Sequence, residues 1–89
     1  MVGYFLDRKA AVFVYHRRLH TVSLFVFRGE DLPWPTRDGR PLDGTRAHAS
    51  TSRGFNVVLW RAGGLGYALV SDVASAELLQ LAGRLLNRS

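Results

Sequence analysis

The chain has 89 residues, of which 47% are hydrophobic and 21% are charged, and its formal net charge is +5; this length fits one domain. It contains no cysteine, which excludes disulfides and thiolate chemistry. No apolar run approaches the roughly 20 residues that cross a bilayer, and the first residues lack the basic start and apolar stretch of a signal peptide.

The first part of the sequence predicts a short strand followed by a β-hairpin. Residues 4–6 form the short apolar run, and residues 10–16 and 21–27 are rich in Val, Phe and Tyr, as strands are. A basic turn that contains His16 and His20 joins the two longer runs. Because the runs are too short to be two helices, they indicate a hairpin.

Residues 29–53 predict a long mobile loop. The segment contains all three prolines and many Gly, Ser, Thr and Asp residues, and it lacks apolar periodicity. Its four arginines balance four acidic residues, so the excess positive charge lies on the rest of the chain. We therefore expect a single domain over residues 1–89, with a mobile loop at residues 29–53.

The last part of the sequence predicts a second hairpin and a helix. Residues 55–61 and 65–70 are the strands, and Gly63 and Gly64 supply the turn. Ser71 and Asp72 are both good N-cap residues for the helix that follows. The predicted apolar face of that helix has the usual i, i+3, i+4, i+7 spacing and consists of Ala74, Leu78, Leu81, Ala82 and Leu85. If Leu81 is fully buried, Leu81→Ala is expected to cost about 2–5 kcal/mol.

Together these elements predict an α+β fold. It consists of a small antiparallel sheet of about five strands, made of two hairpins and the short first strand, with one C-terminal helix packed on it. Both faces of the strands are apolar, whereas one helix covers only one face. The sequence predicts an uncovered patch composed of Phe25, Phe27, Val58 and Trp60. We expect a two-fold homodimer that pairs this patch, or the sheet edges, of two copies.

No catalytic constellation is visible in the sequence. Ser71 beside Asp72 is better explained as a helix cap than as a nucleophile pair, so we expect no enzymatic activity and no cofactor. His16 and His20 could face each other across the hairpin and share a metal ion. Zinc takes three or four ligands, however, and no cysteine or acidic residue lies near them in the sequence, so no metal site is predicted.

Two candidate interaction surfaces follow from the pattern. If the strand at residues 55–61 runs antiparallel to that at 21–27, then Arg17, Arg18 and Arg61 form a basic edge at the end that holds Met1. Such an edge would favour an anionic membrane surface. Alternatively, Phe25, Phe27 and Trp60 on an exposed sheet face would suit a free-standing cytoplasmic protein that binds nucleic acid.

Two separated segments of the chain are similar to the two hairpins of a known domain. The first comprises residues 14–17, His20, Val22 and residues 24–26. The second comprises residues 54–60, Gly66, Tyr67 and residues 70–72, ahead of a helix. Together they resemble the extracytoplasmic, C-terminal domain of transmembrane anti-sigma factors of proteobacteria. The chain departs from the family at residues 27–28, where Trp-Pro is frequent, and at Ala68, where Trp is frequent.

This resemblance implies a role in transcription regulation. In the family, a cytoplasmic domain sequesters a sigma factor, one helix crosses the inner membrane, and a periplasmic domain like this one controls the assembly. The resemblance therefore implies a periplasmic sensor domain whose parent binds a sigma factor through a cytoplasmic region. The interaction candidates from the motif residues and nearby aromatic residues are Tyr15, His16, His20, Phe25, Phe27, Trp60 and Tyr67.

Overall fold

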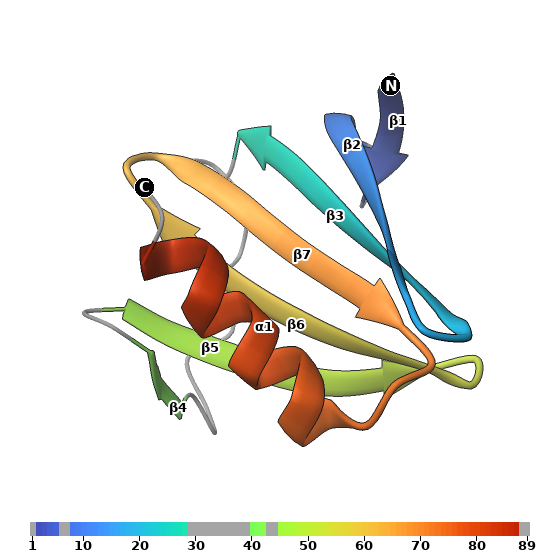
Figure 1. The fold of residues 1–89 in the computed structure, drawn as a ribbon. Helices are drawn as coiled ribbons and strands as arrows, with labels where there is room; N and C mark the ends of the chain where they lie inside the picture. Colours follow the sequence, from blue (N-terminus) through green and yellow to red (C-terminus); the bar gives the residue numbers. More distant parts are fainter. Residues whose placement is uncertain (1, 6–7, 29–39, 43–44, 88–89) are drawn as a thin grey trace.

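The computed structural model describes residues 2–5, 8–28, 40–42 and 45–87 of the chain, and it has the predicted α+β class (Figure 1). An antiparallel sheet carries one C-terminal helix on one face. In chain order the elements are β1 (Val2–Phe5), β2 (Arg8–Arg17), β3 (His20–Arg28), β4 (Arg40–Leu42), β5 (Thr45–Ser52), β6 (Phe55–Ala62), β7 (Leu65–Ser71) and α1 (Ser75–Asn87).

The strands are ordered β1-β2-β3-β7-β6-β5-β4, and every neighbouring pair is antiparallel. Among the described residues the sheet thus has seven strands rather than about five. The last strand of the second hairpin, β7, lies between β3 and β6. Since β7 is antiparallel to both of them, β3 and β6 run in the same direction. This strand order determines which of the candidate residues suggested by the sequence lie at the same end of the sheet, and which lie on the same face.

The segment predicted as a loop at residues 29–53 contains two strands, so that prediction is wrong for its second half. β5 pairs with β6 from His48↔Leu59 to Ser52↔Phe55. Arg53 (φ 51°) and Gly54 (φ 82°) form the connecting turn, in which both residues have the positive φ that tight hairpins favour. Small and polar residues dominate β5, and this composition hides the strand from a search for apolar alternation. Residues 29–39 lie outside the described part of the chain.

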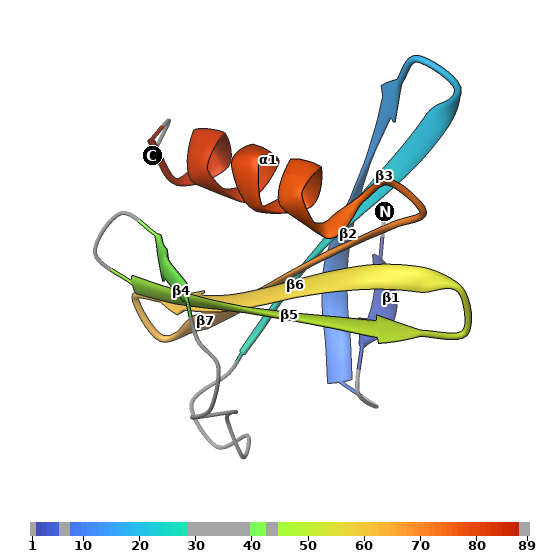
Figure 2. The ribbon, with the colours of Figure 1, turned by 90° about the horizontal axis from the view of Figure 1, so that it is seen from below.

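The helix covers one face of the sheet over β5, β6 and β7, and the β2–β3 hairpin bends toward that side (Figure 2). Side chains from α1, four strands and the link before α1 form the main core beneath the helix. The buried members are Val22, Leu24, Ala47, Val58, Trp60, Leu69, Val73, Leu78 and Ala82. The predicted packing of the C-terminal helix on the sheet is therefore confirmed.

The opposite face carries a second, smaller core around Phe27. Phe27 is 2% exposed, stacks on Phe5 at 5.1 Å between ring centroids, and lies directly opposite Gly66 of β7. The register pairs Phe25 with Ala68, and Ala68 with Leu59. Phe25 and Phe27 are therefore on the face opposite to that of Val58 and Trp60. The predicted four-residue patch does not form, because its members lie on two faces.

The helix begins later than the sequence predicts. The first backbone bond of the α-helical pattern runs from the Leu78 amide to the Ala74 carbonyl at 3.1 Å, which makes Ala74 the N-cap residue. Ser71 ends β7, and Asp72 lies in the link, so neither residue caps α1. The sheet ends at Ser71, and the chain needs three residues to turn back across it. Val73, before the cap, and Leu78 are buried in the same core, as in a hydrophobic staple.

An alanine N-cap leaves a backbone amide of the first turn without a side-chain acceptor. Ala74 is exposed, so a hydroxyl there has room to accept that bond. We expect Ala74→Ser to raise the free energy of unfolding by about 1 kcal/mol. Chemical denaturation measures this, with Ala76→Ser, also exposed but inside the first turn, as the matched control that gains nothing. Equal effects of the two substitutions would contradict Ala74 as the cap.

Candidate functional site

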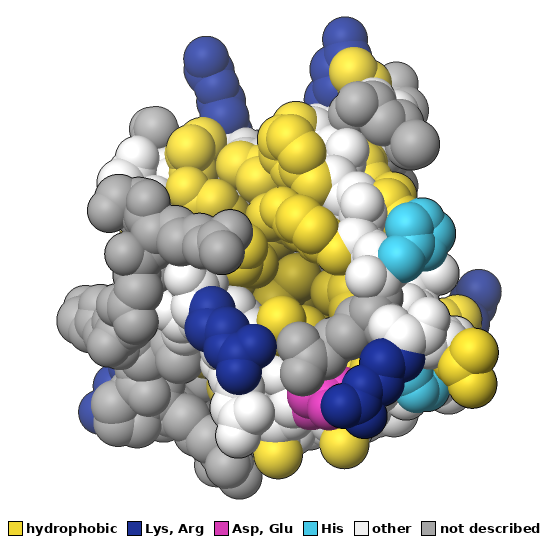
Figure 3. All heavy atoms as spheres, viewed as in Figure 1, with side chains coloured by type: hydrophobic (Ala, Val, Ile, Leu, Met, Phe, Trp, Pro, Cys, Tyr) yellow, Lys and Arg dark blue, Asp and Glu magenta, His cyan; other side chains and the backbone are white. Residues whose placement is uncertain are grey.

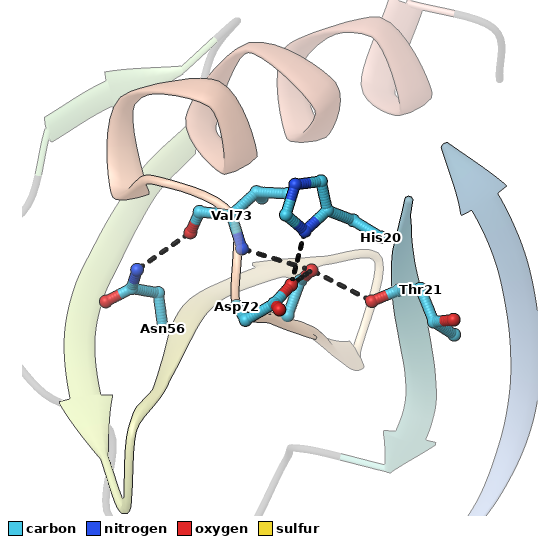
Figure 4. A network of polar contacts seen from close by, with 6 residues as sticks. His20, Thr21, Asn56, Asp72 and Val73 are labelled. Atoms are coloured by element: carbon cyan, nitrogen blue, oxygen red, sulfur yellow. Dashed lines mark hydrogen bonds and ion pairs between the residues drawn. The ribbon is translucent and has the colours of Figure 1, made fainter. Parts of the chain in front are cut away.

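Three chain segments meet at one end of the sheet in a polar junction, which we define as His20, Thr21, Asn56, Ser71, Asp72 and Val73 (Figure 4). His20 at the start of β3 donates from Nδ1 to Oδ1 of Asp72 at 2.8 Å. The Ser71 hydroxyl donates to the Thr21 carbonyl oxygen, also at 2.8 Å. These two bonds join the β2–β3 hairpin to the end of β7 and to the link that leads into α1.

The same junction ties the link to the β5–β6 hairpin. The Asn56 side-chain amide donates to the Val73 carbonyl at 2.7 Å, and Thr51 donates to Oδ1 of Asn56 at 2.8 Å. The Val73 amide donates to the Ser71 hydroxyl at 3.3 Å, which gives Ser71 a local turn role in place of the predicted capping role. Buried polar groups of the link are satisfied in this way, and the start of α1 is fixed relative to both hairpins.

The hydrogen bond from His20 lowers the pKa of the Asp72 carboxyl below its ordinary value. A depressed carboxyl pKa contributes stability that is present above the unfolded value of about 3.9 and is lost as the pH falls through the folded value. We expect His20→Ala to move the Asp72 pKa back toward its ordinary value. Carboxyl NMR titration measures this, with His16→Ala as the matched control. An unchanged Asp72 pKa in His20→Ala would show that the bond does not form in solution.

The two histidines of the hairpin turn do not face each other. His16 pairs with Thr21, whereas His20 pairs with Arg17, so alternation along the strands places the two imidazoles on opposite faces. The predicted possibility of a shared metal ion between them is therefore wrong. Among the side chains that the structure describes, no three His, Cys, Asp or Glu residues gather as a metal site would require.

An open apolar face lies on the helix side, beside α1, and we define it as Phe13, Tyr15, Val26, Leu65 and Tyr67. Figure 3 shows hydrophobic side chains gathered there around a hollow. The face remains open because α1 packs on β5, β6 and β7 and leaves β2 uncovered. Phe13 and Tyr15 remain 50% and 43% exposed. Their pairing opposite the core residues Leu24 and Val22 places both on the helix side of β2.

The aromatic residues predicted as a nucleic-acid platform are mostly buried. Trp60 is 1% exposed beneath the helix and stacks on Tyr67, with ring centroids 5.3 Å apart and planes 4° apart. Phe27 is buried, and Phe25 is half-buried beside Phe5 on the other face. These residues therefore build the cores, and Tyr67 lines the open apolar face. Within the described region the Trp60 indole N–H has no hydrogen-bond partner.

The predicted basic edge is divided between the two ends of the sheet. Arg18 lies in the turn between β2 and β3, whereas Arg61 lies beside the Gly63–Gly64 turn at the opposite end. The cause is the shared direction of β3 and β6. Val2 pairs with Ala11 in the middle of β2, so the start of β1 is also far from Arg18.

Two shallow hollows lie near the end that holds Arg61. One, of about 510 Å³, is lined by Val2, Arg8, Lys9, Ala10, Ala11 and Arg28, and the other, of about 360 Å³, by Arg61, Ala62, Gly63 and Gly64. The described lining residues provide cations and small apolar side chains but neither an acid nor a hydroxyl nucleophile. These hollows therefore lack the paired groups that acid–base or nucleophilic catalysis uses.

The structure thus brings together His20 and Asp72, and separately Trp60 and Tyr67, from the candidates that the sequence suggested. It separates His16 from His20, and Arg18 from Arg61. The helix α1 has 13 residues, and no helix in the described part of the chain is long and apolar enough to span a membrane. Comparison of the chain with models of known families, with curated proteins and with solved structures gave no match in any of the three.

Proposed function

We propose that this domain is a non-catalytic regulatory domain, the periplasmic part of a membrane-bound anti-sigma factor. The observation that supports this best is the contact between the two segments that resemble that family. His20, from the first segment, is hydrogen-bonded to Asp72, from the second, across 52 positions of sequence. Residues that are far apart in the sequence, and that the resemblance selected independently, therefore form one structural unit.

The exposed surface is consistent with a binding role. A regulatory domain needs a surface that a partner can recognise, and a contiguous apolar patch on a small soluble domain is the usual form of such a surface. The open apolar face has this character. In the proposed assembly, sigma-factor sequestration belongs to a cytoplasmic region of the parent. Binding of a partner or ligand to this domain, or its proteolysis, then changes that sequestration.

The proposal is tested in the source organism with a chromosomal epitope tag after Ser89. We expect the tagged protein to be in the membrane fraction, to be much larger than 9.9 kDa, and to be cleaved by protease added to spheroplasts. We also expect a sigma factor to co-purify from detergent extracts. A soluble tagged protein close to 9.9 kDa that survives protease in spheroplasts would refute the proposal.

The second candidate is a cytoplasmic protein that binds nucleic acid. It is favoured by the net charge of +5 and by two exposed aromatic residues, Phe13 and Tyr15, on the strand that leads to the basic turn. Single-stranded nucleic acids bind to such stacking platforms in a salt-dependent manner. Fluorescence anisotropy with a labelled single strand distinguishes the two candidates, because only the second expects binding that is lost in Phe13→Ala/Tyr15→Ala.

A further inference from the structure

Within the described residues, the outer edge of β2 is unpaired over its second half. β1 pairs with β2 only from Phe5↔Arg8 to Val2↔Ala11. Within the part of the chain that the structure describes, no strand lies beside residues 13–17 on that side. Backbone N–H and C=O groups that point away from β3 are therefore available to another strand. The geometry of this edge does not depend on the proposed function, although Phe13 and Tyr15 also belong to the open apolar face.

Most of the exposed edge lacks the features that prevent edge pairing, and its one arginine, Arg17, stands at the end of β2 beside the turn. Natural edge strands carry charged side chains, proline or a bulge to discourage a second strand. Phe13, Val14 and Tyr15 instead are three consecutive apolar residues with exposed fractions of 50%, 42% and 43%. On the other side of the sheet, the equivalent part of β5 is exposed and polar, with Ser50, Thr51 and Ser52. The unprotected edge is therefore that of β2.

We infer that residues 13–17 pair with the same residues of a second copy of this chain. Arg17 and His20 flank the two-residue turn between β2 and β3, so they are a hydrogen-bonded pair, and such pairs alternate along the strand. Val14 and His16 consequently direct their backbone groups away from β3. In an antiparallel pair, Val14 of each copy lies opposite His16 of the other. This pairing satisfies the outward backbone N–H and C=O groups of both residues in both copies.

This register places Tyr15 opposite its own counterpart on the two-fold axis. Phe13 lies opposite position 17 of the second copy, so the register places no two side chains of like charge opposite each other. Sliding the second copy further along the edge is blocked, because β1 occupies the position beside Ala11. The paired segment thus occupies the free edge beyond Val12, and the interface is isologous, as closed dimers require.

The side chains also favour a second copy over a foreign strand. Tyr15 and Phe13 are on the helix side of β2, next to the open apolar face. Two-fold pairing joins the open apolar faces of two copies across one continuous sheet and adds cross-strand aromatic contacts between the copies. An extended peptide from another protein would use the same backbone groups, but it would not place position 15 opposite itself.

Single cysteines test the register, because the natural chain contains none. Tyr15→Cys places two thiols in a non-hydrogen-bonded pair, whose Cα separation of about 4.5 Å suits a disulfide. We expect this variant to form a covalent dimer rapidly under mild oxidation. Val14→Cys, the matched control, puts its two thiols at diagonal positions about 7–8 Å apart, and we expect little cross-linking. Equal rates at the two positions would overturn the register.

Opposite charges at position 15 test the interface without a covalent bond. We expect sedimentation equilibrium to show a dimer of twice 9.9 kDa for the natural chain. Tyr15→Lys alone and Tyr15→Glu alone are expected to be monomers, and an equimolar mixture is expected to dimerise again. Ser50→Lys, on the polar edge, controls for added charge and stays dimeric. A natural chain that remains monomeric, or a mixture that does not recover the dimer, would refute the inference.

Discussion

Leu78→Ala is expected to lower the free energy of unfolding by about 2–5 kcal/mol. Leu78 is fully buried in the main core between α1 and the sheet, and it packs in the same cluster as Trp60 and Val73. The truncation removes apolar contacts and leaves a cavity that the rigid sheet cannot close. Because domains of this size are stable by about 5–15 kcal/mol, the loss is a large part of the total.

The neighbouring Leu81 is the matched control for this effect. The sequence marks Leu81 as an anchor of the helix, but the structure leaves it half-buried at the margin of the core. We therefore expect Leu81→Ala to cost clearly less than Leu78→Ala, by urea denaturation of both variants. Equal losses, or a larger loss for Leu81→Ala, would mean that α1 is rotated about its axis relative to the structure.

Gly66→Ala is expected to destabilise the opposite face of the sheet by about 1–3 kcal/mol. A Cβ atom at Gly66 would lie against the ring carbons of Phe27, closer than atoms can approach. The ring cannot move away easily, since Phe27 is 2% exposed and stacks on Phe5. The substitution therefore overpacks this small core, and thermal or urea denaturation measures the loss.

A double-mutant cycle separates this clash from other effects of losing the glycine. Phe27→Leu shortens the side chain opposite Gly66, so it should relieve the contact with an added Cβ. We expect Gly66→Ala to cost less in the Phe27→Leu background than in the natural chain. If the two substitutions are additive, the aromatic ring does not cause the cost, and the proposed packing of Phe27 over Gly66 is wrong.

Local chemistry in the sequence was sufficient for most of the secondary structure. Val- and Phe-rich runs mark β2 and β3, and Gly63 and Gly64 mark the turn between β6 and β7, where both have positive φ. Spaced leucines after residue 74 mark α1. Each signal depends on neighbours within a few positions, so it survives whatever the tertiary arrangement is. β5 lacks such a signal, because the buried residues described in it are Ala47 and His48. This strand forms because it pairs with β6.

The placement of the candidate residues depended on contacts that no local pattern encodes. Insertion of β7 between β3 and β6 moves Arg61 to the end away from Arg18, and it puts Phe27 and Trp60 on different faces. The same order brings Asp72 beside His20, so an expected helix cap instead joins the β2–β3 hairpin to the link before α1. The sequence by itself determined most of the elements and the α+β class through propensity and periodicity, but not β4 and β5. Only the tertiary structure decided the strand order, the sheet face on which each candidate side chain lies and how far that side chain is exposed. These properties follow from long-range strand pairing and from the area of sheet that a single helix can cover.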